Sequence, residues 1–382
     1  MSFDALTMTF GPAAIVGLLV ALITSLAIVV TRSWHGKLTL DNSDGIQKFH
    51  TAPTPRIGGV SLYVGCVAAW PFLSGDAFNI WGVMLVLGFA AFIAGLVEDL
   101  TKRVTPRTRL IATIFSGGSL AALTGVAYSL IPNFLFVEPT TSLVVLTGIL
   151  IGVAVGGLAN AMNIIDGFHG LASGSLAIMC GAFAVIAHGA NDVDLAAVSA
   201  TLGVTILGFM VINFPMGKLF LGDGGAYFAG FALAAIAILL PVRNPEISPM
   251  VSILVVIYPT YETLFSIIRK SRREGIGPTD PDNLHLHSLI SRSFGRLIAG
   301  WGGMPRARNA ITGALMWPFS LLAGLMAVVA HGDGVIAFIC ILIFAALYGR
   351  MYRIVSLQRP SFMNPLIQSD AARKFRRGSL EH

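Results

Sequence analysis

Long apolar runs dominate the chain, and short polar connections separate them. A helix needs roughly 20 apolar residues to cross the hydrocarbon core of a membrane. By this criterion the pattern predicts about eleven transmembrane helices. The predicted spans are residues 12–31, 56–74, 79–97, 109–128, 142–162, 171–189, 195–213, 226–242, 248–268, 310–330 and 334–352. We therefore expect an all-α, polytopic membrane protein with one membrane domain over residues 1–352 and a basic tail over residues 353–382.

Composition supports the membrane interpretation. The chain is 55% hydrophobic and only 12% charged, with a mean hydropathy of +0.79. A soluble domain carries about 25% charged residues. The low charge therefore argues for an integral membrane protein.

The basic residues are distributed unevenly between the predicted connections. If the N-terminus lies outside, threading eleven spans leaves only Arg243 of the 25 Lys and Arg residues on the outer side. An excess of Lys and Arg in cytoplasmic loops is the usual orientation signal. We therefore expect an outer N-terminus and a cytoplasmic C-terminus. The net charge of +6 then reflects topology and contact with anionic lipid, and we expect no nucleic-acid partner.

Four polar islands interrupt the apolar pattern, and the predicted topology places all of them on the inner face. They are Glu98-Asp99, Asn160–Gly174, the turn around Asp223, and His285-Leu286-His287. Polar groups at a membrane border are costly to desolvate, so a cluster of them indicates function. We therefore predict that the four islands form one site.

The second island carries the most polar groups. Asn160, Asn163 and Asp166 follow one another at a spacing of three, which keeps them on one stripe of a helix. The glycines that follow would let a phosphate or a metal approach the backbone. The alternative is a helix cap followed by a glycine turn.

The other islands each permit a structural and a functional interpretation. Asp223 and Gly222 lie in a glycine-rich turn at the start of a predicted helix. Free N–H groups at a helix start suit phosphate, and a carboxylate suits Mg²⁺. The structural alternative is that Asp223 is a simple N-cap. Glu98-Asp99 precedes several basic residues, so it either holds Mg²⁺ and phosphate or is an ion-paired loop. His285 and His287 are too few for a zinc site, so they either contact phosphate or a base or belong to an ordinary polar loop.

These residues resemble the motifs of the polyprenyl-phosphate N-acetylhexosamine-1-phosphate transferases, which include the translocase that makes the first lipid intermediate of peptidoglycan. The similarity runs from about His50 to Ser288. It rests on Asn-x-x-Asn-x-x-Asp-Gly at 160–167, on Phe-Leu-Gly-Asp-x-Gly at 220–225, and on the histidine motif. The predicted number of spans matches the eleven-helix bacterial branch.

The resemblance implies a reaction and its partners. A sugar-1-phosphate would pass from a UDP-sugar to undecaprenyl phosphate and release UMP, as the first membrane step of O-antigen or similar envelope-glycan synthesis. Mg²⁺ would be required, with Mn²⁺ as the alternative. The enzyme would lie in the bacterial inner membrane with its site facing the cytoplasm, and a homodimer stays open. The loop 269–309 would select the donor sugar, which the sequence does not identify.

The resemblance also implies roles for individual residues. Asp223, with Asp166, would hold the metal, and Asp99, Asp166 and Glu98 would be the catalytic carboxylates. The expected substrate-binding residues are Asn160, Asn163, His285, His287, Arg56, Arg109 and Gly222.

Three positions depart from the family pattern. The family usually has Asp where this chain has Glu98, many relatives have Asp where His169 stands, and a further His often replaces Ser288. The three principal aspartates remain, so we expect activity with a divergent donor sugar.

A secondary transporter and a catalytically silent scaffold are the two alternatives to an enzyme. A secondary transporter would place ionisable groups near the membrane midplane, often in related repeats, whereas here they cluster at the inner ends of the spans; Glu262 comes closest to an exception. A catalytically silent scaffold of the same fold is the second alternative.

Overall fold

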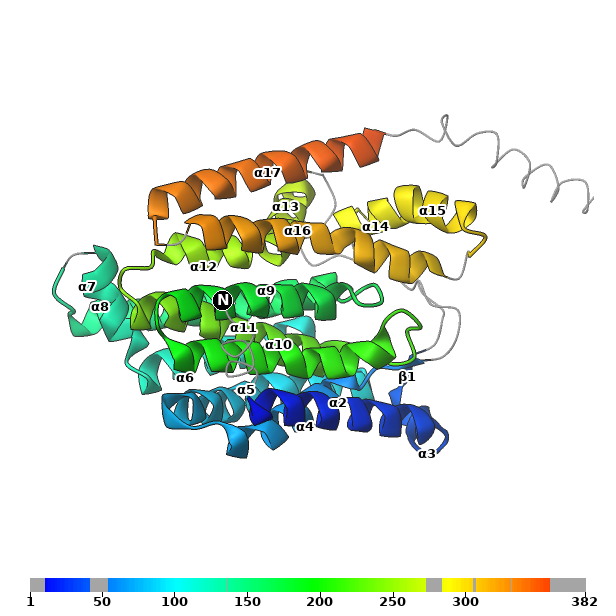
Figure 1. The fold of residues 1–382 in the computed structure, drawn as a ribbon, viewed down its shortest axis with the longest axis horizontal. Coiled ribbons are helices and arrows are strands. Elements are labelled where there is room, and N and C mark those ends of the chain that lie inside the picture. Colours follow the sequence, from blue (N-terminus) through cyan, green and yellow to red (C-terminus); the bar gives the residue numbers. More distant parts are fainter. Residues whose placement is uncertain are drawn as a thin grey trace, which may run out of the picture.

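The computed structural model describes residues 11–41, 54–135, 137–272, 284–304, 307–330 and 332–357. It is a bundle of helices that run along the long axis of the molecule (Figure 1). The bundle begins with α2 (Pro12–Val30), α3 (Arg32–Thr39), α4 (Gly58–Ala69) and η1 (Trp70–Phe72). It continues with α5 (Gly75–Thr101), α6 (Pro106–Leu123), α7 (Val126–Leu135), α8 (Thr141–Ile165), α9 (Leu171–Gly189) and α10 (Val193–Asn213).

The second half of the chain completes the bundle. Its helices are α11 (Gly222–Arg243), α12 (Pro249–Val255), α13 (Ile257–Ser271), α14 (Leu286–Ile290), the π-helical turn η2 (Ser291–Gly295), α15 (Arg296–Trp301), α16 (Arg308–Ala330) and α17 (Gly334–Leu357). The predicted loop 269–309 is described only in part, and the tail lies outside the described residues from position 358 onward. The all-helical prediction is confirmed apart from one short pair of strands.

Eight helices of the described chain are long and apolar enough to cross a membrane, or nine if one bent pair counts as a span. That pair is α12 and α13, which meet at an angle of 77° where a single straight span over 248–268 was expected. The helix in the predicted span 56–74 is short, and α6 carries Arg107 and Arg109 in its first turn. A multi-pass membrane protein is thus confirmed, while the number of eleven crossings stays a prediction.

Helix α11 is the centre of the bundle. It packs against α4, α5, α8, α9 and α12. In its most apolar stretch of 18 residues, 83% of the residues are buried, more than in any other candidate span of the described chain. Glycines allow this close packing, as is usual between membrane helices. A Cβ built on Gly59 of α4 would lie 2.2 Å from the backbone nitrogen of Gly225, and one built on Gly230 would lie 2.4 Å from Cα of Ala159.

The segment before α4 is tied by backbone hydrogen bonds to the segment after α3 and to the segment before α11. Strand β1 (Leu40–Asp41) pairs with β2 (Thr54–Pro55). The carbonyl of Pro55 accepts a hydrogen bond from the N–H of Phe220 at 2.9 Å, and the carbonyl of Phe220 accepts one from Gly58 at 2.8 Å. Residue 56 is therefore held beside the first turn of α11.

The polar islands meet at one end of the bundle. Helices α5 and α8 end there, while α4, α6 and α11 begin there, as the side-chain contacts between them show. Figure 1 shows β1, α14 and α15 toward the same end and α7 at the opposite end. The Glu98-Asp99, Asn160–Gly174 and Asp223 islands therefore lie at the same end of the bundle.

The packing of α5 on α11 leads to the first prediction. A Cβ on Gly95 would lie 2.5 Å from the backbone of Asp223 and Gly224, so Gly95→Ala must push α5 away from α11. We expect it to lower the free energy of unfolding by about 1–3 kcal/mol, measured by thermal unfolding in detergent.

Gly157→Ala is the matched control, because this glycine also lies inside a helix but a Cβ there would meet nothing within 4 Å. It should leave stability unchanged or raise it slightly, since alanine favours helix more than glycine does. Equal stability of the two variants would show that α5 and α11 are not in such close contact.

Candidate active site

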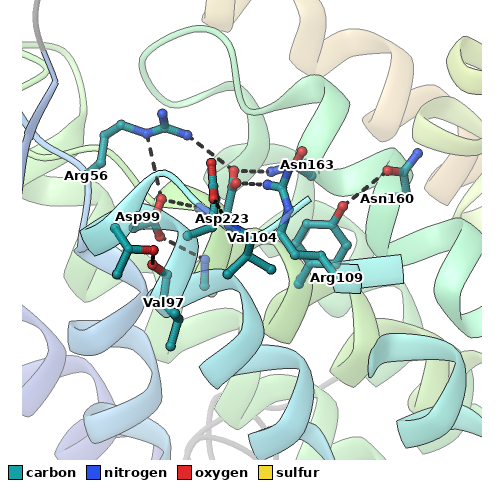
Figure 2. A network of polar contacts seen from close by, with 12 residues as sticks. Arg56, Val97, Asp99, Val104, Arg109, Asn160, Asn163 and Asp223 are labelled. Atoms are coloured by element: carbon teal, nitrogen blue, oxygen red, sulfur yellow. Dashed lines mark hydrogen bonds and ion pairs between the residues drawn. The ribbon is translucent and has the colours of Figure 1, made fainter. Parts of the chain in front are cut away.

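Asp223 lies at the centre of the polar cluster, in the first turn of α11 (Figure 2). Its Oδ1 accepts hydrogen bonds from Nδ2 of Asn163 at 2.8 Å and from Nη2 of Arg56 at 3.2 Å. Its Oδ2 forms an ion pair with Arg109. The residue is only 6% exposed, so these three donors replace water around the carboxylate. One carboxylate thus gathers side chains from α6, α8 and the start of α4.

Asp99 lies next to Asp223, and its side chain binds the backbone of α11, the helix that carries Asp223. Its Oδ1 accepts from the N–H of Asp223 at 3.0 Å, and its Oδ2 accepts from the N–H of Gly224 at 2.9 Å. The first N–H groups of a helix have no partner within the helix, and the positive end of the helix dipole favours an anion. Asp99, from α5, therefore caps the N-terminus of α11. This gives a predicted catalytic residue a clear anchoring contact.

Gly222 is required by the close approach of three segments. Its φ is +75°, in the left-handed region that glycine adopts readily. A Cβ at this position would lie 1.9 Å from the carbonyl oxygen of Arg56 and 2.7 Å from Oδ2 of Asp99. No other residue fits between these atoms, so Gly222 shapes the site through its backbone.

Asp166 follows the last residue of α8 and approaches the same turn. Its carboxylate accepts a hydrogen bond from the N–H of Gly222. Desolvation raises the pKa of the Asp166 carboxyl to about 8, and the nearby Asp99 adds to this rise, while Arg56 and the Gly222 hydrogen bond oppose it. The carboxylates of Asp166 and Asp99 are therefore close enough to interact electrostatically.

Asn160 lies one turn before Asn163 and contacts a different residue of α11. Its Oδ1 accepts a hydrogen bond from the hydroxyl of Tyr227 at 3.3 Å. The guanidinium of Arg109 lies over the Tyr227 ring, 5.6 Å from the centroid. The predicted polar stripe on α8 is confirmed in that both asparagines face α11. Asn160 acts on the cluster indirectly, through Tyr227 and Arg109.

Glu98 points away from Asp223. Its Oε2 accepts a hydrogen bond from the N–H of Val104 at 2.7 Å, which holds the turn between α5 and α6. The structure therefore separates the two members of the acidic pair. Asp99 is bound to α11, whereas Glu98 is bound to the turn that precedes Arg109.

The histidine island meets the second island at Gly167. The rings of His285 and His287 stack at a centroid distance of 5.2 Å, and the ring of His287 lies 5.5 Å from that of Phe168. A Cβ on Gly167 would lie 3.9 Å from Nε2 of His287. Both histidines are mostly buried. The structure thus brings His287 next to the residue that follows Asp166.

His169, the divergent position, contacts the connection between α10 and α11. Its backbone N–H donates to Oδ1 of Asn309 at 2.6 Å, and its Nδ1 lies 3.2 Å from the carbonyl oxygen of Pro215. Its ring packs near Phe220, with a centroid distance of 5.7 Å. The side chain therefore fills space against a neighbouring loop.

Three contributing residues were not among the predicted site residues. Tyr227 supports Arg109 and lies one helical turn after Asp223, so helical spacing could have identified it. Asn213 accepts from the N–H of Gly170 at 2.7 Å and donates to the carbonyl of Leu219 at 2.8 Å. Glu262 binds His285 at 2.9 Å. Asn213 and Glu262 lie outside the motifs, Glu262 by 23 residues from His285, and their partners depend on tertiary packing.

The cluster offers oxygen donors to a divalent cation. Among the described residues, no group of three or more His, Cys, Asp or Glu side chains is arranged to hold a metal. Mg²⁺, however, is usually held by one or two carboxylates and completes its shell with water and substrate phosphates. Asp223 and Asp166 supply such hard oxygen donors. The residues therefore fit Mg²⁺ chemistry in the presence of a phosphorylated substrate.

Comparison with known proteins agrees with this geometry. Residues 81–241 match the glycosyl transferase family 4, a segment that contains Asp99, Asp166 and Asp223. The chain is 30% identical over 297 residues to a phospho-N-acetylmuramoyl-pentapeptide-transferase of Halalkalibacterium halodurans, covering 72% of this chain and 82% of the relative.

Two further relatives transfer N-acetylglucosamine phosphate. One is a decaprenyl-phosphate N-acetylglucosaminephosphotransferase of Mycolicibacterium smegmatis, 29% identical over 306 residues, covering 72% of this chain and 75% of the relative. The other is an undecaprenyl-phosphate alpha-N-acetylglucosaminyl 1-phosphate transferase of Yersinia pestis, 24% identical over 278 residues, covering 70% and 73%. The chain belongs to glycosyl transferase family 4, the family of polyprenyl-phosphate N-acetylhexosamine-1-phosphate transferases and phospho-MurNAc-pentapeptide transferases.

Proposed function

We propose that the protein transfers an N-acetylhexosamine-1-phosphate from a UDP-sugar to undecaprenyl phosphate, with UMP as the second product. The observation that carries this proposal is the cluster around Asp223, where two arginines, an asparagine and two further aspartates meet at one end of the helix bundle. Phosphoryl transfer depends chiefly on positioning and on neutralising phosphate charge. A cluster of cations and carboxylates at a membrane border suits one soluble and one lipid substrate.

The proposed reaction exchanges one phosphorus–oxygen bond for another. An oxygen of the lipid phosphate attacks the β-phosphorus of the UDP-sugar, and the bond from that phosphorus to the oxygen bridging the two phosphates breaks. That oxygen leaves with UMP. A proton on the lipid phosphate passes to a carboxylate, and Asp166 is the better candidate because both oxygens of Asp99 already accept backbone N–H groups.

The remaining residues of the cluster bind and orient phosphate in this proposal. Asp223 and Asp166 would hold Mg²⁺, which neutralises the charge of the diphosphate. Arg56 and Arg109 pair with Asp223 in the structure and would turn toward phosphate oxygens when substrate enters. Nε of Arg109 is buried and has no hydrogen-bond partner within the described part of the chain. His287, beside Gly167, would contact the donor nucleotide.

We place this site on the cytoplasmic face of a bacterial inner membrane, in line with the distribution of basic residues along the chain. Arg243, the exception, forms ion pairs with Asp192, at 2.7 and 3.0 Å, and with Asp76. Its charge is therefore neutralised at the end of α11 opposite to Asp223. The ionisable groups around Asp223 lie at helix ends, with Glu262 inside α13 as the exception, and this clustering argues against a transporter. An O-antigen or related envelope glycan is the proposed destination of the product.

The direct test is UMP release by purified protein. With undecaprenyl phosphate, Mg²⁺ and a panel of UDP-N-acetylhexosamines, we expect UMP to form with at least one donor, and EDTA to abolish it because the diphosphate charge is no longer neutralised. A reaction without the lipid is the control. UMP release that needs no lipid acceptor, or that survives EDTA, would contradict the proposal.

Asp223→Asn tests the centre of the cluster. The substitution keeps the shape of the side chain but removes the charge that pairs with Arg56 and Arg109 and would hold the metal. We expect UMP release to fall at least about 100-fold, which corresponds to the several kcal/mol that metal and charge stabilisation supply. Asp333→Asn is the matched control, because this residue caps α17 and asparagine caps helices equally well. Near wild-type turnover of Asp223→Asn would refute the metal assignment.

Asp99→Asn and Asp166→Asn separate anchoring from proton transfer. Asparagine at position 99 has one acceptor oxygen instead of two, so one of two backbone N–H groups loses its partner. We expect a loss of about 1–3 kcal/mol in the free energy of unfolding, together with a loss of turnover. Asp166→Asn should lower turnover with a thermal midpoint close to that of the wild type. If Asp99→Asn loses turnover at full thermal stability, Asp99 takes part in the reaction directly.

A further inference from the structure

Glu262 is a buried carboxylate outside the cluster around Asp223. It lies on α13, just beyond the bend between α12 and α13, and its exposed fraction is 0%. A buried charge is retained only where hydrogen bonds and opposite charges compensate for lost water. The surroundings of Glu262 therefore show what the side chain holds in place.

Three donors surround the Glu262 carboxylate. Its Oε1 accepts from the backbone N–H of Leu286 at 3.1 Å and lies 2.9 Å from Nδ1 of His285, and its Oε2 accepts from the hydroxyl of Tyr348 at 2.6 Å. Both oxygens of an ionised Glu262 can only accept, so the hydrogen in its contact with His285 is then carried by Nδ1. The hydrogen-bonding pattern thus fixes the tautomer, as in other carboxylate–histidine pairs. Nε2 is the ring nitrogen that Glu262 does not engage.

The same region anchors the backbone on both sides of His285. Glu262 binds the N–H of Leu286, and Arg269 donates to the carbonyl of Leu284 at 2.9 Å and to the hydroxyl of Tyr352 at 3.0 Å. Both anchors come from α13, and both are braced by tyrosines of α17. The ring of His285 is therefore fixed in position and orientation.

A stacked pair of rings connects Glu262 with the candidate active site. The planes of His285 and His287 differ by 12°, with centroids 5.2 Å apart. Nε2 of His287 lies 3.9 Å from the Cβ position of Gly167, which follows Asp166. Displacing His285 would remove the surface on which His287 is stacked. Glu262 thus acts on the site through two histidines.

We propose that Glu262 is a positioning residue that orients His285, and through it His287, for binding the diphosphate of the nucleotide donor. This inference rests on the proposed transfer reaction and assigns a specific role to a residue that the motifs do not mark.

The test is a double-mutant cycle on the full-length protein. Glu262→Gln keeps the size of the side chain but removes its charge and leaves one acceptor oxygen in place of the two that bind His285, Leu286 and Tyr348. We expect kcat/KM for the UDP-sugar to fall about 10- to 100-fold, as is typical when a carboxylate supporting a functional histidine is lost. The KM for undecaprenyl phosphate should stay unchanged. His285→Ala should cause a similar loss, and the double variant should be no worse than His285→Ala alone.

Tyr258→Phe is the matched control on the same helix. Its hydroxyl is buried one turn before Glu262 and makes no hydrogen bond within the described residues, so its removal should leave kcat/KM at the wild-type value. Losses that multiply in the double variant, or an equal rise in the KM of both substrates, would show a general packing role for Glu262 and overturn the inference.

A binding measurement separates this inference from the proposed reaction. Titration with UDP in the presence of Mg²⁺ should show about 10-fold weaker binding in Glu262→Gln and in His285→Ala. If the wild type binds UDP but releases no UMP, the transfer proposal fails and the binding comparison still decides the role of Glu262. Wild-type affinity in Glu262→Gln, or no binding of UDP by the wild type, overturns the inference.

Discussion

The site depends on two hydrogen bonds that the Asp99 carboxylate accepts from the first turn of α11. Asp99 is only 1% exposed, so its charge needs partners, and the N–H groups of Asp223 and Gly224 supply them at the positive end of the helix dipole. The same contact fixes the backbone of Asp223, whose side chain gathers Arg56 and Arg109. One buried carboxylate thus positions another; Arg56 pairs with both carboxylates, and Arg109 pairs with Asp223.

This arrangement requires helices whose backbones nearly touch. Gly95 lets α5 approach the turn that Asp99 caps, and Gly222 lets the carbonyl of Arg56 lie against the same turn. Larger residues at either position would separate the carboxylates from the N–H groups that stabilise them. The many glycines of the apolar runs therefore serve the site as well as the packing, because hydrogen bonds to a helix end are sensitive to small displacements.

The sequence predicted what depends on local pattern. Apolar run length indicated the membrane helices, and the spacing of Asn160 and Asn163 indicated that both face one neighbour, which proved to be α11. The bend between α12 and α13 was not predicted, although Pro259, in the first turn of α13, is a residue type that interrupts a continuous helix. The partnership of Glu262 with His285 could not be predicted either. It depends on how α13, α14 and α17 pack, and that is set by contacts far apart in the chain.

Two departures from the family pattern, Glu98 and His169, lie at positions whose side chains contact loops around the cluster. Glu98 uses its longer side chain to reach the N–H of Val104 and hold a turn, so its identity is not tied to the geometry of Asp223. His169 packs on the connection between α10 and α11, against Pro215 and Phe220. Both substitutions thus alter contacts that support loops around the cluster and leave the cluster itself intact. The side chains that meet at Asp223 are held instead by Asp99, Asn163 and the two arginines, so their arrangement depends on other contacts than those of Glu98 with Val104 and of His169 with Pro215.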